Sequence, residues 1–240
     1  MNAQAVIDAF NDPNLDGPGQ TWTHIRLSLT ALVIASALGV TLGVAAAKSG
    51  SRLAQLVVVV VSNLGRTVPT FALMALVVAL SSIGEGPALV GLVALGVPPI
   101  LLNAHTAVRG VDASVVESAR GMGFTRAGVL TRVELPLALP LIFAGIRISA
   151  TQIVATAVLA ATVGAGGLGV LILAGLSNSD DAVLLAGAIP TAALALAIGA
   201  ALAGMQWLLT PRGLRRRRPS PTLATQPAVS HAAPQEGPPP

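Results

Sequence analysis

The sequence predicts an all-α, polytopic membrane protein with five transmembrane helices. Of its 240 residues, 53% are hydrophobic and only 10% are charged, and the mean hydropathy is +0.78. A soluble domain of this length needs more polar side chains to cover its surface. Several apolar stretches reach the ~20 residues that cross a bilayer. Membrane lipid is therefore the expected surrounding, and the composition excludes an ordinary cytosolic enzyme, a disordered protein and a nucleic-acid partner.

Five apolar stretches are the predicted spans. They cover residues 25–47, 53–80, 87–108, 137–163 and 182–209. As a straight helix the second stretch would be about 42 Å long at 1.5 Å per residue, too long for one perpendicular crossing. It contains Pro69, so we expect one span that is kinked there.

Charges between the spans predict which connections share a side of the membrane. Segments 48–52, 109–136 and 212–218 hold two, four and five basic residues. The other connections, 1–23, 81–87 and 164–181, contain no Lys or Arg. With five spans the two kinds of connection alternate, as the positive-inside rule requires for a protein with its N-terminus outside and its C-terminus inside.

The chain divides into a membrane domain and two tails. The predicted transmembrane domain covers residues 25–210, with its longest inner loop at 109–136. Residues 1–24 form an extracytoplasmic tail, whose acidic residues and missing basic region argue against a cleaved signal peptide. Residues 211–240 begin with a basic cluster and then become rich in proline, so we expect a disordered cytoplasmic tail.

The residues that most catalytic or metal sites require are missing. The chain has no cysteine, three histidines and one lysine, Lys48, which follows Ala47 instead of the glycine of a P-loop. The predicted spans contain no Asp or Glu that could relay protons. We therefore expect no catalytic residue, metal site or cofactor in this chain, and hence no enzyme.

A glycine-rich segment at 164–169 matches the pattern Gly-x-Gly-x-x-Gly. In a dinucleotide site this pattern follows a short strand, whereas here it follows a long apolar stretch. We interpret the segment as a flexible outer turn at which backbones approach closely.

The loop 109–136 carries the most information. It reads RGVDASVVESARGMGFTRAGVLTRVELP. Asp112 and Thr125 are the predicted N-caps of two short helices. Gly121 and Gly123 lie between them and break the helix. The loop should therefore form a compact knob on the cytoplasmic side.

Seven residues of this loop have a diagnostic spacing. They are Glu117, Ser118, Ala119, Gly123, Val133, Leu135 and Pro136. The spacing resembles that of the cytoplasmic motif of binding-protein-dependent ABC importer permeases, with Ser118 in place of Ala and Val133 in place of Ile. The resemblance implies that the loop is a coupling helix that docks onto a separate ABC ATP-binding subunit, with Glu117, Ala119 and Gly123 on the docking surface.

The resemblance extends over residues 20–210. It is greatest to the branch that imports quaternary-amine osmoprotectants such as glycine betaine, carnitine and choline, and it rests on segments 66–73, 99–103, 144–147, 163–169 and 188–190. It implies a non-catalytic, multi-pass permease of the bacterial inner membrane. The implied partners are the ATPase, an extracytoplasmic substrate-binding protein and a second permease copy or a paralogue. The alternatives are a permease for methionine or another amino acid, or a membrane assembly protein without transport activity.

Three polar residues of the spans are candidates for the translocation path. Arg66 and Arg147 are the deepest charges, and a buried arginine costs several kcal/mol unless it is paired or faces water. Asn103 is the third candidate. The alternative is that these side chains bond to backbone carbonyls near Pro69 or to a neighbouring helix.

Few aromatic residues fall in the predicted spans. They are Phe71, Phe143 and Trp207. Trimethylammonium groups are usually bound by cages of several aromatic rings. High-affinity recognition of such a cargo is therefore expected on the separate binding protein, with the permease providing a gated path.

Overall fold

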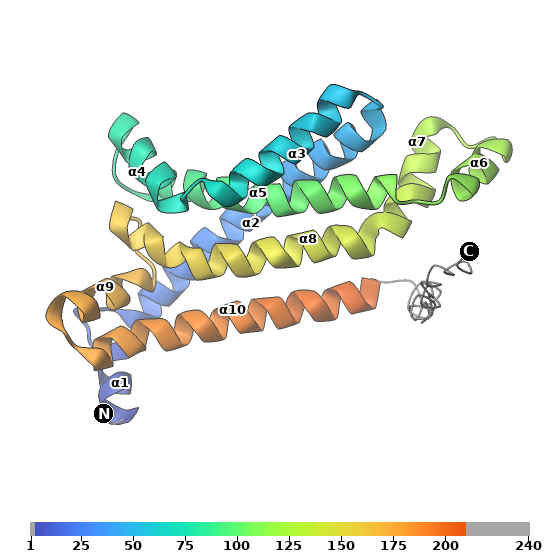
Figure 1. The fold of residues 1–240 in the computed structure, drawn as a ribbon. Helices are drawn as coiled ribbons and strands as arrows, with labels where there is room; N and C mark the ends of the chain where they lie inside the picture. Colours follow the sequence, from blue (N-terminus) through green and yellow to red (C-terminus); the bar gives the residue numbers. More distant parts are fainter. Residues whose placement is uncertain (1–2, 210–240) are drawn as a thin grey trace, which may run out of the picture. The chain divides into compact units, whose positions relative to one another are not determined.

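The structure is a computed structural model that describes residues 3–209, apart from the side chains of Arg66 and Leu209; the predicted tail 211–240 lies outside the described residues. Every regular element of this part is a helix, which confirms the all-α prediction (Figure 1). The α-helices are α1 (Ala3–Phe10), α2 (Gly17–Ser49), α3 (Arg52–Thr67), α4 (Thr70–Leu80), α5 (Glu85–Arg109), α6 (Ala113–Gly121), α7 (Arg126–Val129), α8 (Leu135–Thr156), α9 (Gly169–Asn178) and α10 (Asp181–Leu209). A π-helix, η1 (Leu130–Glu134), and a 3₁₀-helix, η2 (Ala157–Val163), flank α8.

Four helical stretches are long and apolar enough to cross a membrane by themselves. They are α2, α5, the continuous stretch from α7 to η2, and α10. They match the first, third, fourth and fifth predicted spans. The second predicted span is divided between α3 and α4, which give a fifth crossing if they count as one broken span.

The first span begins eight residues earlier than predicted, at Gly17 instead of Ile25. Asp16 caps this helix, because its carboxylate accepts a hydrogen bond from the N–H of Gly19 at 3.1 Å. Pro18 occupies the first turn, where its missing N–H costs nothing. Much of the segment predicted as a tail is therefore helical, including α1.

The fourth span also begins earlier, because the helix continues from Arg126 into the membrane instead of starting at Leu137. Pro136 has no N–H, so it cannot make the α-helical hydrogen bond to the residue four positions before it. The turn before it widens into η1, where the N–H of Leu135 donates to the carbonyl of Leu130. The end of the loop, from Arg126, and the fourth span therefore form one continuous helical segment.

The helices α3 and α4 meet at an angle of 94°. Proline disfavours helical geometry in the residue before it, and Val68 is extended, with φ −76° and ψ 119°. Pro69 itself has φ −65° and ψ 120°. The predicted break at Pro69 is confirmed, but the bend is much sharper than that of a kinked single helix.

The end of α2 and the inner loop lie at the same end of the helices. The ammonium of Lys48 contacts both carboxylate oxygens of Glu134 at 2.7 Å. The basic segments 48–52 and 109–136 therefore share one side, as their charges predict.

The connections without basic residues lie together at the opposite end. The N–H of Gly84, between α4 and α5, donates to the carbonyl of Val163 at 2.8 Å. Gln20, near the start of α2, bonds to Gly167 after η2. Helix α3 begins at the end of the assembly where Lys48 lies, and α4 leads to the opposite end, where Gly84 lies. The broken pair of α3 and α4 therefore runs once from one end of the assembly to the other.

Helix α5 packs against both α2 and α8, and α8 packs against α10. Small residues allow the closest approach. A Cβ added to Gly43 of α2 would lie 2.7 Å from the carbonyl oxygen of Leu101 and 2.8 Å from the Cβ of Ala104. Close contact through glycine and alanine is typical of helices that associate in lipid.

Candidate functional site

The loop between α5 and α8 folds as the sequence predicts. The carboxylate of Asp112 accepts a hydrogen bond from the N–H of Ser114 at 2.9 Å and caps α6. The hydroxyl of Thr125 accepts from the N–H of Gly128 at 3.1 Å and caps α7. Gly123 lies between the helices with φ +86°, a conformation that other residues rarely adopt.

The seven motif residues divide into an exposed and a packed group. Glu117, Ser118 and Gly123 are exposed at the surface of the loop. Val133, Leu135 and Pro136 are half-buried at the start of the span. Ala119 is only 2% exposed, so its side chain packs within the loop, and its assignment to the docking surface stays a prediction. Its carbonyl accepts from the N–H of Phe124 at 3.2 Å, so this residue holds the loop together.

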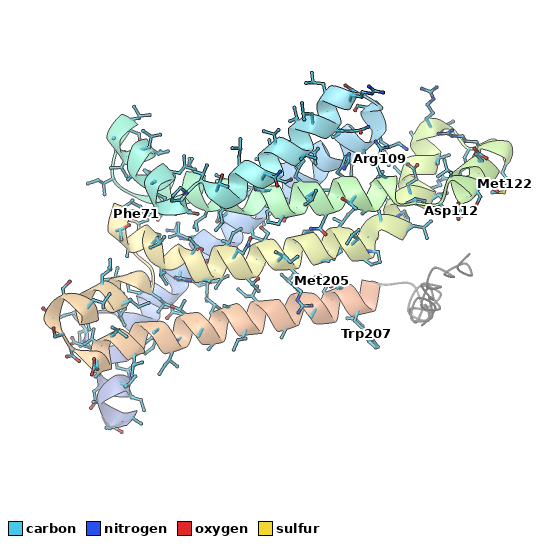
Figure 2. All side chains as sticks on the ribbon, in the orientation of Figure 1. Phe71, Arg109, Asp112, Met122, Met205 and Trp207 are labelled. Atoms are coloured by element: carbon cyan, nitrogen blue, oxygen red, sulfur yellow. The ribbon has the colours of Figure 1, made fainter. Side chains whose placement is uncertain are left out.

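A hollow of about 530 Å³ lies beside Gly123. Phe124, Thr125 and Arg132 contribute to its wall, and so does Met122 at the tip of the loop. The Met122 side chain is 71% exposed, and Figure 2 shows it at the outer edge of the loop. Met122 was not singled out from the sequence, although it directly precedes the motif residue Gly123.

Sequence reasoning also missed the partner of Glu134. This carboxylate is 4% exposed, whereas the side chain of Lys48 is 37% exposed. The predicted fourth span starts at Leu137 and contains no carboxylate. The observed helical stretch starts at Arg126 and therefore includes Glu134. The available signal was that Glu134 directly precedes Leu135-Pro136 at the start of an apolar stretch, where a carboxylate needs a cation, and that Lys48 is the only lysine in the chain.

The three predicted path residues lie in different surroundings. Asn103 is half-buried on α5, and its amide nitrogen donates to the carbonyl of Pro99 at 2.8 Å. Arg147 is exposed on α8, and within the described residues its guanidinium makes no ion pair. Arg66 lies in the last turn of α3 near the break, but its side chain lies outside the described part. The assignment of all three residues to the path stays a prediction.

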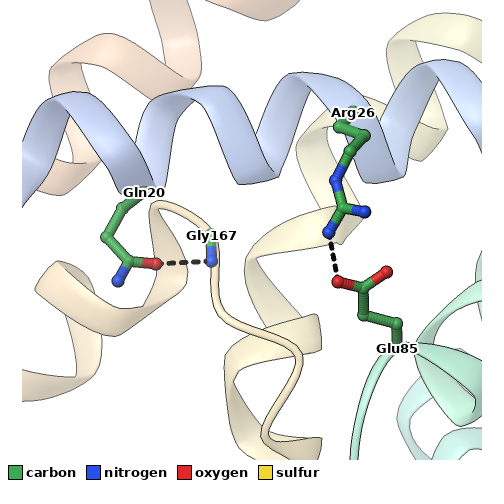
Figure 3. A network of polar contacts seen from close by, with 4 residues as sticks. All are labelled: Gln20, Arg26, Glu85 and Gly167. Atoms are coloured by element: carbon green, nitrogen blue, oxygen red, sulfur yellow. Dashed lines mark hydrogen bonds and ion pairs between the residues drawn. The ribbon is translucent and has the colours of Figure 1, made fainter.

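The opposite end is tied together by polar contacts (Figure 3). The side-chain oxygen of Gln20 accepts a hydrogen bond from the N–H of Gly167 at 2.8 Å. Arg26 on the same helix pairs with Glu85 at the start of α5. Gly167 has φ +89° and packs against His24, so the glycine-rich segment is a turn of close backbone approach, as predicted.

Within residues 3–209 no group of three or more His, Cys, Asp or Glu side chains could hold a metal ion. The inner loop 109–136 is helical from Arg126 onward and continues without a break into α8. A loop that is continuous with a span can transmit a movement from a cytoplasmic partner into the membrane.

Comparisons with known proteins agree with this architecture. Residues 39–214 match the family described as binding-protein-dependent transport system inner membrane component. The chain is 38% identical over 214 residues to the carnitine transport permease protein OpuCB of Listeria monocytogenes, covering 89% of this chain and 97% of that protein. It is 36% identical over 196 residues to the glycine betaine/carnitine/choline transport system permease protein OpuCB of Bacillus subtilis (strain 168). This match covers 82% of this chain and 89% of that protein.

A solved structure with the same fold is an inward-facing form of the MetNI methionine ABC transporter. Its TM-score is 0.69 at 24% identity, and the match covers 79% of this chain and 94% of that one. At this identity the likeness supports the fold alone. The family match and the 38% identical relative, together with the apolar helices, show that this chain belongs to the binding-protein-dependent transport system inner membrane components.

Proposed function

We propose that this chain is the permease of an ATP-driven importer for quaternary-amine osmoprotectants such as carnitine, choline and glycine betaine. The observation that carries the proposal is the 38% identity to a carnitine permease over nearly the whole of both chains. The relative from Bacillus subtilis, whose name includes all three cargoes, supports the same class. The three molecules share a trimethylammonium group.

Energy for transport comes from a separate ATP-binding subunit that docks on the loop. Glu117, Ser118 and Gly123 contact the subunit, and the hollow beside Gly123 receives one of its side chains. Because the loop continues as α8, a displacement of the loop moves the span as well. ATP binding draws two such loops together and opens the path outward, and hydrolysis resets it.

Cargo selection belongs to an extracytoplasmic binding protein. The aromatic residues of the predicted spans lie on different elements, with Phe71 on α4 and Trp207 near the end of α10 (Figure 2). Phe143 lies on α8. This distribution supports a path with little selectivity of its own. A second copy of this chain, or a related permease, forms the other half of the path.

Uptake measurements test the proposed cargo. Cells with and without this gene are given labelled glycine betaine at high osmolarity, and labelled methionine in parallel. We expect deletion to abolish betaine uptake, with methionine uptake unchanged, and a plasmid copy to restore it. Loss of methionine uptake alone would keep the permease and replace the cargo. Unchanged uptake of both would contradict the proposed cargo class.

A further inference from the structure

A partly polar cavity of about 430 Å³ lies beside the break between α3 and α4. Gly65, Val68 and Thr70 line it from the break. It reaches α5 at Pro98 and Asn103, and α8 at Gln152. Helices that are interrupted within a membrane protein often border a binding site, because their irregular backbone must face a cavity or other protein.

Two prolines on α5 leave two backbone carbonyls beside the cavities without their usual helical hydrogen-bond donors. An α-helical carbonyl normally accepts from the N–H four residues later. Pro98 and Pro99 have no N–H, so the carbonyls of Ala94 and Leu95 lack that donor. Leu95 lines this cavity and also an adjoining apolar cavity of about 450 Å³, whose wall includes Ala94.

Two side-chain amides add further oxygens. The amide nitrogen of Asn103 is already bonded to Pro99, so its oxygen remains available as an acceptor. Gln152 lies on the exposed side of α8 and borders the same cavity. Acceptors thus reach the cavity from two helices.

Among the described residues that line this cavity, none is charged. A trimethylammonium group carries a positive charge but no hydrogen-bond donor, so it needs oxygen dipoles or aromatic faces together with apolar surface for its methyl groups. Rings of carbonyl oxygens replace the hydration shell of a cation in channel filters by the same principle. Carbonyl and amide oxygens beside an apolar cavity therefore suit this group.

We propose that the cavity is a site within the membrane at which the trimethylammonium group of the cargo binds during transport. The oxygens of Asn103 and Gln152 contact the cation, together with the carbonyl of Leu95, which lacks its helical donor because of Pro99, and the adjoining apolar cavity accepts its methyl groups. The site recognises what carnitine, choline and betaine have in common. This proposal rests on the proposed function.

Cysteine labelling tests the site directly, because the natural chain contains no cysteine. Asn103→Cys and Gln152→Cys place a thiol in the cavity, in the complete transporter in membranes. Asn63→Cys is the matched control, since Asn63 is an exposed amide on α3 that does not line either cavity. Each variant reacts with a methanethiosulfonate that carries trimethylammonium, and separately with one that carries sulfonate. Labelling is quantified on this chain after its separation from the partners.

We expect the ratio of cationic to anionic labelling rates to be at least tenfold higher at positions 103 and 152 than at position 63. Tetramethylammonium and glycine betaine should slow labelling at the first two positions only. Equal ratios without protection, or no labelling at either cavity position, would overturn the site. Uptake by the unmodified transporter is measured in the same membranes, so a wrong cargo class is distinguished from a wrong site.

Asn103→Leu adds a functional test. We expect betaine uptake to fall about tenfold while the loaded binding protein still stimulates ATP hydrolysis, because docking and coupling are intact. Asn63→Leu makes the same chemical change outside the cavity and should leave uptake unchanged. Normal uptake by Asn103→Leu, in a transporter whose unmodified form imports betaine, would contradict the site.

Discussion

Lys48, in the last turn of α2, contacts both carboxylate oxygens of Glu134 at 2.7 Å across 86 residues of sequence. Glu134 lies in the π-helical turn between the docking loop and α8. The loop is therefore joined to α2 by this ion pair and to α8 by continuous helix. We therefore expect a movement of the loop to displace both helices together.

Removal of Lys48 should be strongly destabilising. Lys48→Met leaves the Glu134 carboxylate buried without its partner, and we expect a loss of about 3 kcal/mol. The double variant Lys48→Met/Glu134→Leu should recover most of this loss, because both charges are then gone. Thermal unfolding of the purified protein measures each step.

Arg52→Met is the control for this pair. It removes a basic residue from the same segment but no described ion pair. We expect nearly unchanged stability. If Lys48→Met unfolds no more easily than Arg52→Met, the pair contributes nothing and this interpretation is wrong.

Gly123→Asp should abolish transport while the chain still inserts into the membrane. The position has φ +86° and faces open space, so the new side chain strains the turn by about 1–2 kcal/mol and projects from the surface at which we propose that the ATPase docks. Copurification of the ATPase measures docking. Gly121→Asp is the matched control, since that site is equally open, has no positive φ and lies outside the motif. Normal uptake with Gly123→Asp would refute the docking assignment.

Gln20→Leu should weaken the outer end of the helices. It removes the acceptor for the N–H of Gly167, and an unsatisfied buried donor costs about 1–3 kcal/mol. We expect a lower unfolding temperature and faster proteolysis near the glycine-rich turn. The same change at Gln55, for which the structure shows no side-chain hydrogen bond within its described part, should have little effect. Equal stability of the two variants would mean that this bond does not hold the turn.

Gly43→Ala should push α2 and α5 apart. Its Cβ would lie 2.7 Å from the carbonyl of Leu101, which is main chain and cannot rotate away. Overpacking of this kind costs about 1–3 kcal/mol. Gly204→Ala, on α10, meets no atom within 4 Å and should be neutral or slightly stabilising. Unfolding in detergent compares the two variants, and an unaffected Gly43→Ala would show that the contact can relax.

Several features were predictable because they depend on local chemistry. The apolar stretches, the break at Pro69 and the caps at Asp112 and Thr125 follow from composition and from the bonding of neighbouring residues. The sidedness of the connections follows from charge alone, and the contacts of Lys48 and Gly84 group them as predicted. The motif spacing identified the family for the same reason, since it lies within one loop.

Other features depended on packing between segments far apart in the chain. In a membrane protein the lipid-facing and buried faces of a helix are both apolar, so hydrophobicity does not show which face meets which neighbour. Sequence therefore did not show that Ala119 is buried inside the loop. It also did not show that Asn103 and Gln152 border the same cavity, and it placed the start of the fourth span eleven residues late.

The sequence by itself determined the apolar stretches, their order, the grouping of their connections and the position of the loop that carries the motif, because each depends on residues that are close together in the chain. Only the tertiary structure decided that Lys48 meets Glu134, that the broken helix turns by 94°, and that Asn103 and Gln152 border one cavity. The ion pair and the cavity exist only when α2, α5 and α8 are packed against one another. Pro69 predicts a break, but its angle depends on how α3 and α4 pack against α5, which no local pattern contains.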